Sequence, residues 1–179
     1  MAVTKIHAIK ATIDKAIDYI CNPDKTDEKL YISSFACAPE TAALDFKYTL
    51  DHTTEQSLVN GKDRENKAFH IIQAFQPGEV SYEEAHAIGK ELAGKVLEGK
   101  YSYVLTTHID KGHVHNHLIF CAADNMDFKH YHDSKQSYRR IRSISDKLCQ
   151  EHGLSVIPEN QNRGMKYKEW QANKTESSW

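Results

Sequence analysis

The sequence predicts an α+β fold built on a sheet that is at least partly antiparallel. Two observations support this prediction. Stretches with the two-residue apolar alternation of strands take turns along the chain with stretches that have the 3.6-residue spacing of helices. In addition, residues 101–109 and 114–122 both alternate and are separated only by a short turn, so they form a hairpin, whose strands are antiparallel.

The first strand and helix are predicted near the start of the chain. Residues 5–10 predict a strand, and Thr12 is a candidate N-cap for the helix that follows. This helix carries its apolar residues Ile13, Ile17 and Ile20 on one face. It therefore packs against the sheet along one side.

The next elements repeat this pattern. Residues 30–38 predict a second strand, and Pro39 opens a second helix. Residues 68–75 predict a third strand, because apolar and β-branched residues run through them and a Pro-Gly turn follows.

Two long helices flank the hairpin. Ser81 and Glu84 form a capping box for the first, which runs to Gly99. The second carries apolar residues at helical spacing over 138–148 and ends at Gly153. Before it, residues 128–133 contain a second group of His and Asp residues, which we interpret as a loop because it lies on no periodic strand.

The composition indicates one globular domain. The chain has 179 residues, of which 40% are hydrophobic and 27% charged, so it is long enough to bury a core. We expect residues 1–160 to form the domain and the polar residues 161–179 to be an extension that begins a downstream region. No apolar run approaches the length of a membrane span, and the first residues lack the apolar core of a signal peptide, which predicts a cytoplasmic protein.

Charge and cysteine content exclude several classes. The four cysteines form no C-x-x-C pair, which argues against a thiolate zinc site or a disulfide framework. A net charge of −2 argues against a protein that coats nucleic acid nonspecifically. Basic residues nevertheless gather in the last third, and those on the final helix are either a solvated face or a DNA-binding surface. They are Lys135, Arg139, Arg140 and Arg142.

The hairpin concentrates four imidazoles and one carboxylate within ten residues, namely His108, Asp110, His113, His115 and His117. Side chains two apart on a strand share a face, so the last three histidines point the same way. His108 joins them if the register pairs it with any one of the three. Convergent neutral imidazoles bind divalent metal ions, usually three at an open site. The pattern therefore predicts a metal site with four candidate ligands, and Asp110 can accept the far N–H of one of them.

A metal site of this kind suits phosphoryl chemistry. A divalent ion held by neutral imidazoles keeps its double charge and open positions, so it can polarise a phosphoryl oxygen. Attack by water would make the chain a hydrolase, whereas attack by a side chain would leave a covalent intermediate, for which tyrosine is a candidate. Among nine tyrosines, Tyr19 lies at the margin of the first helix's apolar face, and Tyr31 and Tyr48 are alternatives.

Three segments of the chain resemble the relaxase/mobilisation nuclease family, which comprises conjugative relaxases of the MOBP type within the HUH endonucleases. The first is the histidine motif, which continues into Leu-Ile-Phe at 118–120. The second is Asp-Tyr-Ile at 18–20, on a helix end. The third runs from Ser-Tyr-Arg-Arg-Ile-Arg at 137–142 to Gly-Leu at 153–154.

This resemblance implies a central, mostly antiparallel sheet with helices packed on it and the histidine hairpin in its centre. It implies that His108, His115 and His117 bind one Mg²⁺ or Mn²⁺ ion. Tyr19 would attack a phosphodiester at the origin of transfer of a conjugative or mobilisable element, giving a covalent 5′-phosphotyrosine and a free 3′-hydroxyl.

One position departs from the family's name, which implies a hydrophobic residue between the last two histidines, where this chain has Asn116. Since His113-Val114-His115 fits the name literally, His113 remains an alternative ligand or a supporting group.

The resemblance also implies partners. These are the single strand and hairpin of the origin of transfer, auxiliary relaxosome proteins and a coupling protein, in the cytoplasm of a bacterium; we expect a monomer. Alternatives are a rolling-circle replication initiator, a metal-stabilised DNA-binding module without catalysis, and a metallohydrolase that acts on nucleotides.

Overall fold

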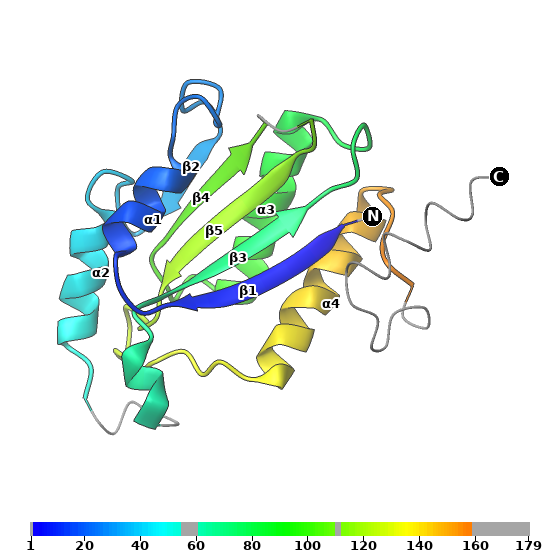
Figure 1. Ribbon diagram of the computed structural model, residues 1–179. Coiled ribbons are helices and arrows are strands. Elements are labelled where there is room, and N and C mark those ends of the chain that lie inside the picture. Colours follow the sequence, from blue (N-terminus) through cyan, green and yellow to red (C-terminus); the bar gives the residue numbers. More distant parts are fainter. Residues whose placement is uncertain (1, 55–60, 110–111, 159–179) are drawn as a thin grey trace.

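A five-stranded sheet forms the centre of the protein (Figure 1). The computed structural model describes residues 2–54, 61–109 and 112–158. The elements, in chain order, are β1 (Val3–Ile9), α1 (Ile13–Ile20), β2 (Ile32–Phe35), α2 (Ala42–Asp51), the 3₁₀ helix η2 (Gly61–Glu65), β3 (Ala68–Ala74), α3 (Tyr82–Leu97), β4 (Tyr103–His108), β5 (His115–Cys121) and α4 (Lys135–Glu151). The predicted α+β class is confirmed.

All four strand pairings are antiparallel, in the order β1-β3-β5-β4-β2. The predicted hairpin is β4 and β5, and β5 is the central strand, as the family resemblance implies (Figure 1). His108 pairs directly with His115. Because directly paired residues point to the same side of a sheet, the register places His108 on the face that carries His115 and His117.

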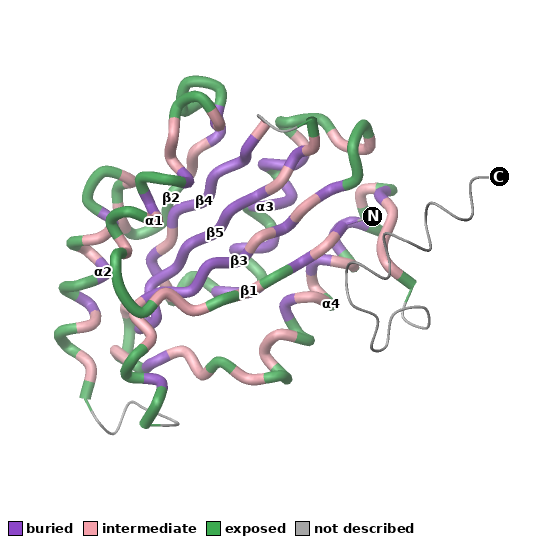
Figure 2. The backbone as a smooth tube through the Cα atoms, in the orientation of Figure 1, coloured by how far each residue is buried: buried purple, intermediate pink, exposed green. Residues whose placement is uncertain are grey.

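Helices cover both faces of the sheet. On one face α3 and α4 pack over Phe69, Leu118 and Phe120, and α3 lies behind the sheet in Figure 1. On the other face α1 and α2 pack over Val104 and Ile119. The strands of the hairpin are buried along most of their length, whereas parts of the edge strand β1 are exposed (Figure 2). In the described parts of the chain, no helix is both long and apolar enough to cross a membrane.

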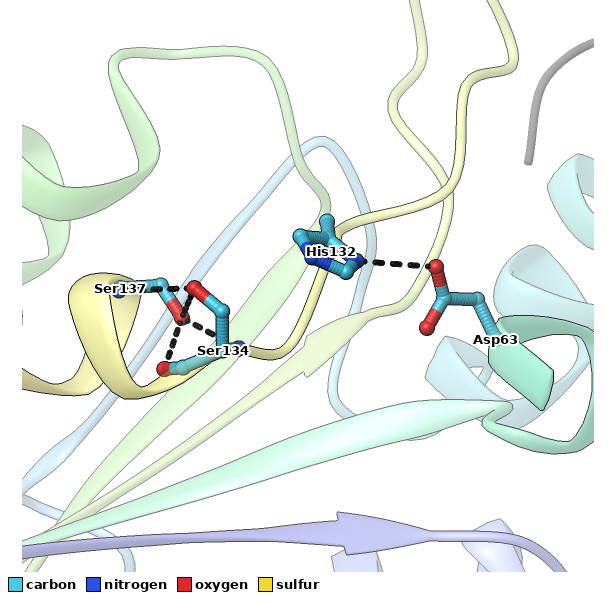
Figure 3. Close-up of polar contacts among 4 residues, drawn as sticks. All are labelled: Asp63, His132, Ser134 and Ser137. Atoms are coloured by element: carbon cyan, nitrogen blue, oxygen red, sulfur yellow. Dashed lines mark hydrogen bonds and ion pairs between the residues drawn. The ribbon is translucent and has the colours of Figure 1, made fainter. Parts of the chain in front are cut away.

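The helices α1 and α4 differ in how they begin. Thr12 stands at the N-cap of α1, as predicted, with a left-handed backbone (φ +56°) and a side chain that makes no capping hydrogen bond. The helix α4 begins with a capping box in which Ser134 and Ser137 exchange hydrogen bonds (Figure 3).

The second His/Asp cluster is a loop, as predicted, and it helps to hold the chain ahead of α4. His132 Nδ1 lies 3.2 Å from Asp63 Oδ2 (Figure 3). This contact connects the loop to η2, which precedes β3, so the cluster has a packing role there.

Asn116, the departure from the family's motif, lies on the opposite face of β5 from the histidines. It is 1% exposed. Its Nδ2 donates to Gln73 Oε1 (3.0 Å) and to the Ala85 carbonyl (2.7 Å), and its Oδ1 accepts from Thr107 Oγ1 (2.7 Å). The amide thus joins β5 to β3, β4 and α3 at the point where the histidines are presented on the other side.

The close approach of Asn116 to α3 depends on Gly89. A Cβ at this position would lie 2.8 Å from Asn116 Nδ2 and 3.1 Å from Leu105 Cδ1. We expect Gly89→Ala to lower the free energy of unfolding by about 1–2 kcal/mol, because overpacking costs more than the helix propensity that alanine adds. The thermal midpoint would fall by several degrees.

Gly94 on the same helix provides the matched control for this prediction. A Cβ there meets nothing within 4 Å. Gly94→Ala should therefore raise stability by up to about 1 kcal/mol. Equal effects of the two substitutions in chemical denaturation would contradict the packing role of Gly89.

Candidate active site

The described chain contains one compact group of metal-ligating side chains, formed by His108, His115 and His117. One nitrogen from each ring lies within 4.8 Å of the others. His108 comes from the end of β4, and the other two come from the start of β5, so the antiparallel register brings them together. These are the three histidines that the family resemblance implies as ligands.

A hydrogen bond to the backbone orients His108. Its Nε2 lies 2.8 Å from the carbonyl oxygen of Ile20. A carbonyl only accepts, so Nε2 carries the proton, and in the neutral ring Nδ1 then carries the lone pair. Metal-binding histidines commonly make such a bond with the nitrogen that faces away from the ion. The same bond connects the end of α1, where Tyr19 lies, to the histidine cluster.

His117 is oriented by a histidine that the sequence did not single out. His117 Nδ1 lies 2.8 Å from His70 Nε2 on β3. Burial, together with the neighbouring histidines and Lys25, lowers the pKa of His117 and keeps its ring neutral. Burial and the charges of His7 and His108 lower the pKa of His70 to about 3.

The buried Nε2 atom of His117 has no hydrogen-bond partner among the described residues. An unsatisfied buried nitrogen is costly unless a ligand completes it. His117 therefore presents a lone pair toward the cluster, as a metal ligand would. His70 could have been suspected from its place in the third predicted strand, but only the register puts it beside His117.

The remaining motif residues are less well defined by geometry. His113 precedes β5, and its ring stacks on His115 with the centroids 5.1 Å apart. Its role as a supporting group or alternative ligand stays a prediction. Asp110 lies outside the described residues, so its predicted support of a ligand also stays a prediction.

Tyr19 lies beside the cluster. Its ring centroid is 6.0 Å from that of His108 and 6.4 Å from that of His117. The side chain is 50% exposed, so a large substrate can reach its hydroxyl.

The alternative tyrosines are less suited to attack a phosphate. Tyr31 is buried and donates to Glu83 Oε1 at 3.0 Å, and burial and this carboxylate raise its pKa. Tyr48 is exposed on α2, where its ring packs against His52.

Lys25 is a further charged group at the site, and no motif in the sequence marks it. Its Nζ lies 3.9 Å from the centre of the Tyr19 ring. Lys25 is in the acidic segment between α1 and β2, and no sequence pattern separates it from the other lysines there.

The basic residues predicted to bind DNA lie on α4, on the face of the sheet away from the histidines. Arg140 donates to the carbonyls of Lys95 and Val96 and pairs with Glu98, so it also fixes α4 to the end of α3. Arg142 lies 3.9 Å from Asp146 on its own helix. Contact of these residues with DNA stays a prediction.

A histidine-bearing antiparallel sheet of this kind is the architecture of a relaxase-type nuclease domain. The chain belongs to the relaxase family of MobA/VirD2-like nuclease domains, whose family model matches residues 19–154. The resemblance drawn from the sequence motifs is thereby confirmed.

Curated relatives agree with this membership. A "Protein rlx" of Staphylococcus aureus is 32% identical over 100% of this chain and 50% of its own length. A second is 35% identical over 87% of this chain and 44% of its length. The group II intron-interrupted relaxase LtrB of Lactococcus lactis is 27% identical over 86% of this chain and 33% of its length. The chain thus spans half or less of the length of these relatives.

Solved structures share the fold. The MobM relaxase domain, bound to plasmid pMV158 oriT DNA and Mn, matches 96% of this chain and 98% of its own, with a TM-score of 0.59 and 11% identity. A structure described as the molecular basis of vancomycin resistance transfer in Staphylococcus aureus matches 90% of this chain and 99% of its own, with a TM-score of 0.55 and 14% identity.

Proposed function

We propose that this domain nicks one DNA strand at the origin of transfer of a conjugative or mobilisable element and later rejoins it, using Tyr19 as the nucleophile. The observation that carries this proposal is the position of Tyr19. The ring of this half-exposed residue lies beside His108 and His117, which come from two different strands. Family membership and the relatives named relaxase support the same activity.

The three histidines fit a divalent metal ion. Their donor atoms are imidazole nitrogens from one compact group, and the buried Nε2 of His117 has no other partner in the described chain. We infer that His108, His115 and His117 hold Mg²⁺ or Mn²⁺, and the Mn in the MobM structure supports this inference. When bound, such an ion supplies Lewis-acid polarisation of a phosphoryl oxygen.

Tyr19 performs the bond exchange. Its hydroxyl oxygen bonds to the phosphorus as the bond from phosphorus to the 3′-oxygen breaks. The hydroxyl proton passes to solvent, and the departing oxygen takes a proton to become a 3′-hydroxyl. The product is a 5′-phosphotyrosine ester. Since one phosphodiester replaces another, the reverse reaction rejoins the strand without ATP.

We infer that the DNA approaches the histidines along the exposed side chains of the edge strand β1. His7 and Lys5 on β1 are exposed, and the register through β3 puts Lys5 on the same face as His117. The cationic side chain of Lys5 favours a phosphate backbone. Contact by Lys135, Arg139, Arg140 and Arg142 would lie away from the cleaved bond, on the opposite face of the sheet.

Family membership also supports an expectation about the partners and location of the full-length protein. We expect auxiliary relaxosome proteins and a coupling protein to act with the full-length protein, in the bacterial cytoplasm.

The test uses the protein with labelled single-stranded oligonucleotides that tile a candidate origin of transfer, with Mn²⁺ or EDTA. We expect a metal-dependent covalent adduct on denaturing gels, a free 3′-hydroxyl on the released fragment, and the adduct on the peptide that contains Tyr19. Cleavage that leaves a free 5′-phosphate and no adduct would instead identify a hydrolase.

His70 should affect metal affinity through His117. If His117 binds metal through Nε2, its Nδ1–H donates to His70 Nε2, and that acceptor orients the ring. We expect His70→Leu to weaken Mn²⁺ binding by about 10- to 100-fold, as removal of a supporting partner usually does.

The effect should depend on the hydrogen-bond acceptor at position 70. His70→Gln, which retains an acceptor, should lose less affinity than His70→Leu. His7→Leu, at the exposed end of this row of rings, should bind Mn²⁺ like the wild type. Titration calorimetry with Mn²⁺ measures all three, and unchanged binding by His70→Leu would contradict this role.

A further inference from the structure

Lys25 lies beside the nucleophile Tyr19, and the reaction proposed above gives it no role. Its ammonium lies 3.9 Å from the ring centre of Tyr19, within the range of a cation–π contact. In the described part of the chain, no carboxylate forms an ion pair with it, although ion pairs hold several other lysines. Lys25 is partly exposed, so its ammonium can be reached by an anion.

The backbone holds Lys25 at this position. Its N–H donates to the Asn22 carbonyl (3.1 Å), and its own carbonyl accepts from the N–H of Ile109 (2.9 Å), the residue that follows His108. The next residue, Thr26, is fully buried, and its hydroxyl donates to the Asn22 carbonyl at 2.9 Å. Lys25 is therefore attached at its backbone to the strand that carries a candidate metal ligand.

Lys25 lies near both the nucleophile Tyr19 and the histidine cluster. It faces the ring of Tyr19, and it is one of the neighbouring charges that act on His117. A phosphate that meets the Tyr19 hydroxyl in front of the histidines must therefore come close to this ammonium. Charge-assisted hydrogen bonds from Lys to phosphate oxygens are among the strong polar contacts of proteins.

We propose that Lys25 is a catalytic residue, whose ammonium binds a non-bridging oxygen of the scissile phosphate while Tyr19 attacks. This proposal rests on the proposed function. Two non-bridging oxygens gain negative charge as the Tyr19 oxygen bonds to phosphorus and the 3′-oxygen leaves. A fixed cation stabilises that charge, and it does so in both directions of the exchange. Lys25 itself neither gains nor loses a bond or a proton.

The first measurement is single-turnover cleavage of an origin oligonucleotide in Mn²⁺ by wild type, Lys25→Met and Lys25→Arg. We expect Lys25→Met to lower the rate of adduct formation at saturating DNA by about 10²- to 10³-fold, as loss of one electrostatic contact to a transition state does. The DNA concentration that gives half of the maximal rate should differ between Lys25→Met and the wild type by no more than about threefold. A single phosphate contact contributes little to the binding of a long strand. Lys25→Arg should recover part of the rate.

A second measurement separates contact with the phosphate from a merely structural role. Oligonucleotides with a methylphosphonate at the cleaved position, resolved into the two stereoisomers, lack one or the other non-bridging oxygen charge. In wild type, the isomer without the oxygen that Lys25 binds should react far more slowly than the natural substrate. In Lys25→Met the same replacement should cost much less, because the partner is already absent.

Lys29→Met, an exposed lysine in the same segment, is the matched control and should cleave at the wild-type rate. A Lys25→Met rate within about threefold of wild type, or equal methylphosphonate effects in the two proteins, would overturn the role of Lys25. Absence of any adduct with the wild type would instead reject the proposed function itself. We also expect Lys25→Met to have the melting temperature of the wild type, because the Lys25 side chain is not part of the core.

Discussion

Tyr19→Phe should abolish the covalent protein–DNA adduct. The substitution removes only the hydroxyl oxygen that is proposed to bond to phosphorus, and phenylalanine offers no other nucleophile. We expect adduct formation to fall by more than about 10³-fold, which is below detection in an ordinary gel assay. The ring remains, so the contacts with Lys25 and with His108 and His117 are kept.

The fold should be unaffected by this change. The side chain is half exposed, and surface substitutions of this kind alter stability by no more than about 0.5 kcal/mol. Binding of Mn²⁺ and of an uncleaved oligonucleotide should also match the wild type. Tyr48→Phe, at the exposed tyrosine on α2, is the matched control and should cleave normally. An adduct that persists in Tyr19→Phe would assign the nucleophile to another residue.

His117→Ala should remove most of the metal affinity. His117 is 5% exposed, lies in the compact histidine group, and presents a buried nitrogen with no other partner among the described residues. We expect Mn²⁺ binding to weaken by more than about 100-fold, a loss larger than that for a supporting residue. We expect Mn²⁺ to raise the melting temperature of the wild type but not that of His117→Ala, because a ligand stabilises the folded state only when its concentration exceeds its dissociation constant.

His113→Ala is the control that decides between the two possible sets of ligands. His113 stacks on His115 ahead of β5 and is not a member of the compact group. It should bind Mn²⁺ within about threefold of the wild type, whereas a loss as large as that of His117→Ala would make His113 a ligand. The comparison uses the Mn²⁺-induced shift in melting temperature, so a change in the basal stability of either variant does not confuse it.

Local patterns in the sequence determined most of the fold. Alternation and helical spacing predicted every strand and α-helix that the structure describes, because each element carries its own apolar periodicity. The turn between two alternating runs predicted the antiparallel hairpin, and its histidines predicted a metal site. Three short motifs, around Tyr19, in the histidine hairpin and in the last helix, also predicted the family, since the residues within each motif are close together in the sequence.

Tertiary structure alone decided which distant residues support the site. His70, Lys25 and Ile20 lie between 38 and 97 residues before His117 or His108 in the sequence, and they reach the cluster only through strand order and loop path. The one-residue precision of the β4–β5 register determined that His108 faces the other ligands. The sequence also could not predict the role of Asn116, since a polar residue on a buried face is explained only by the partners that the fold brings to it.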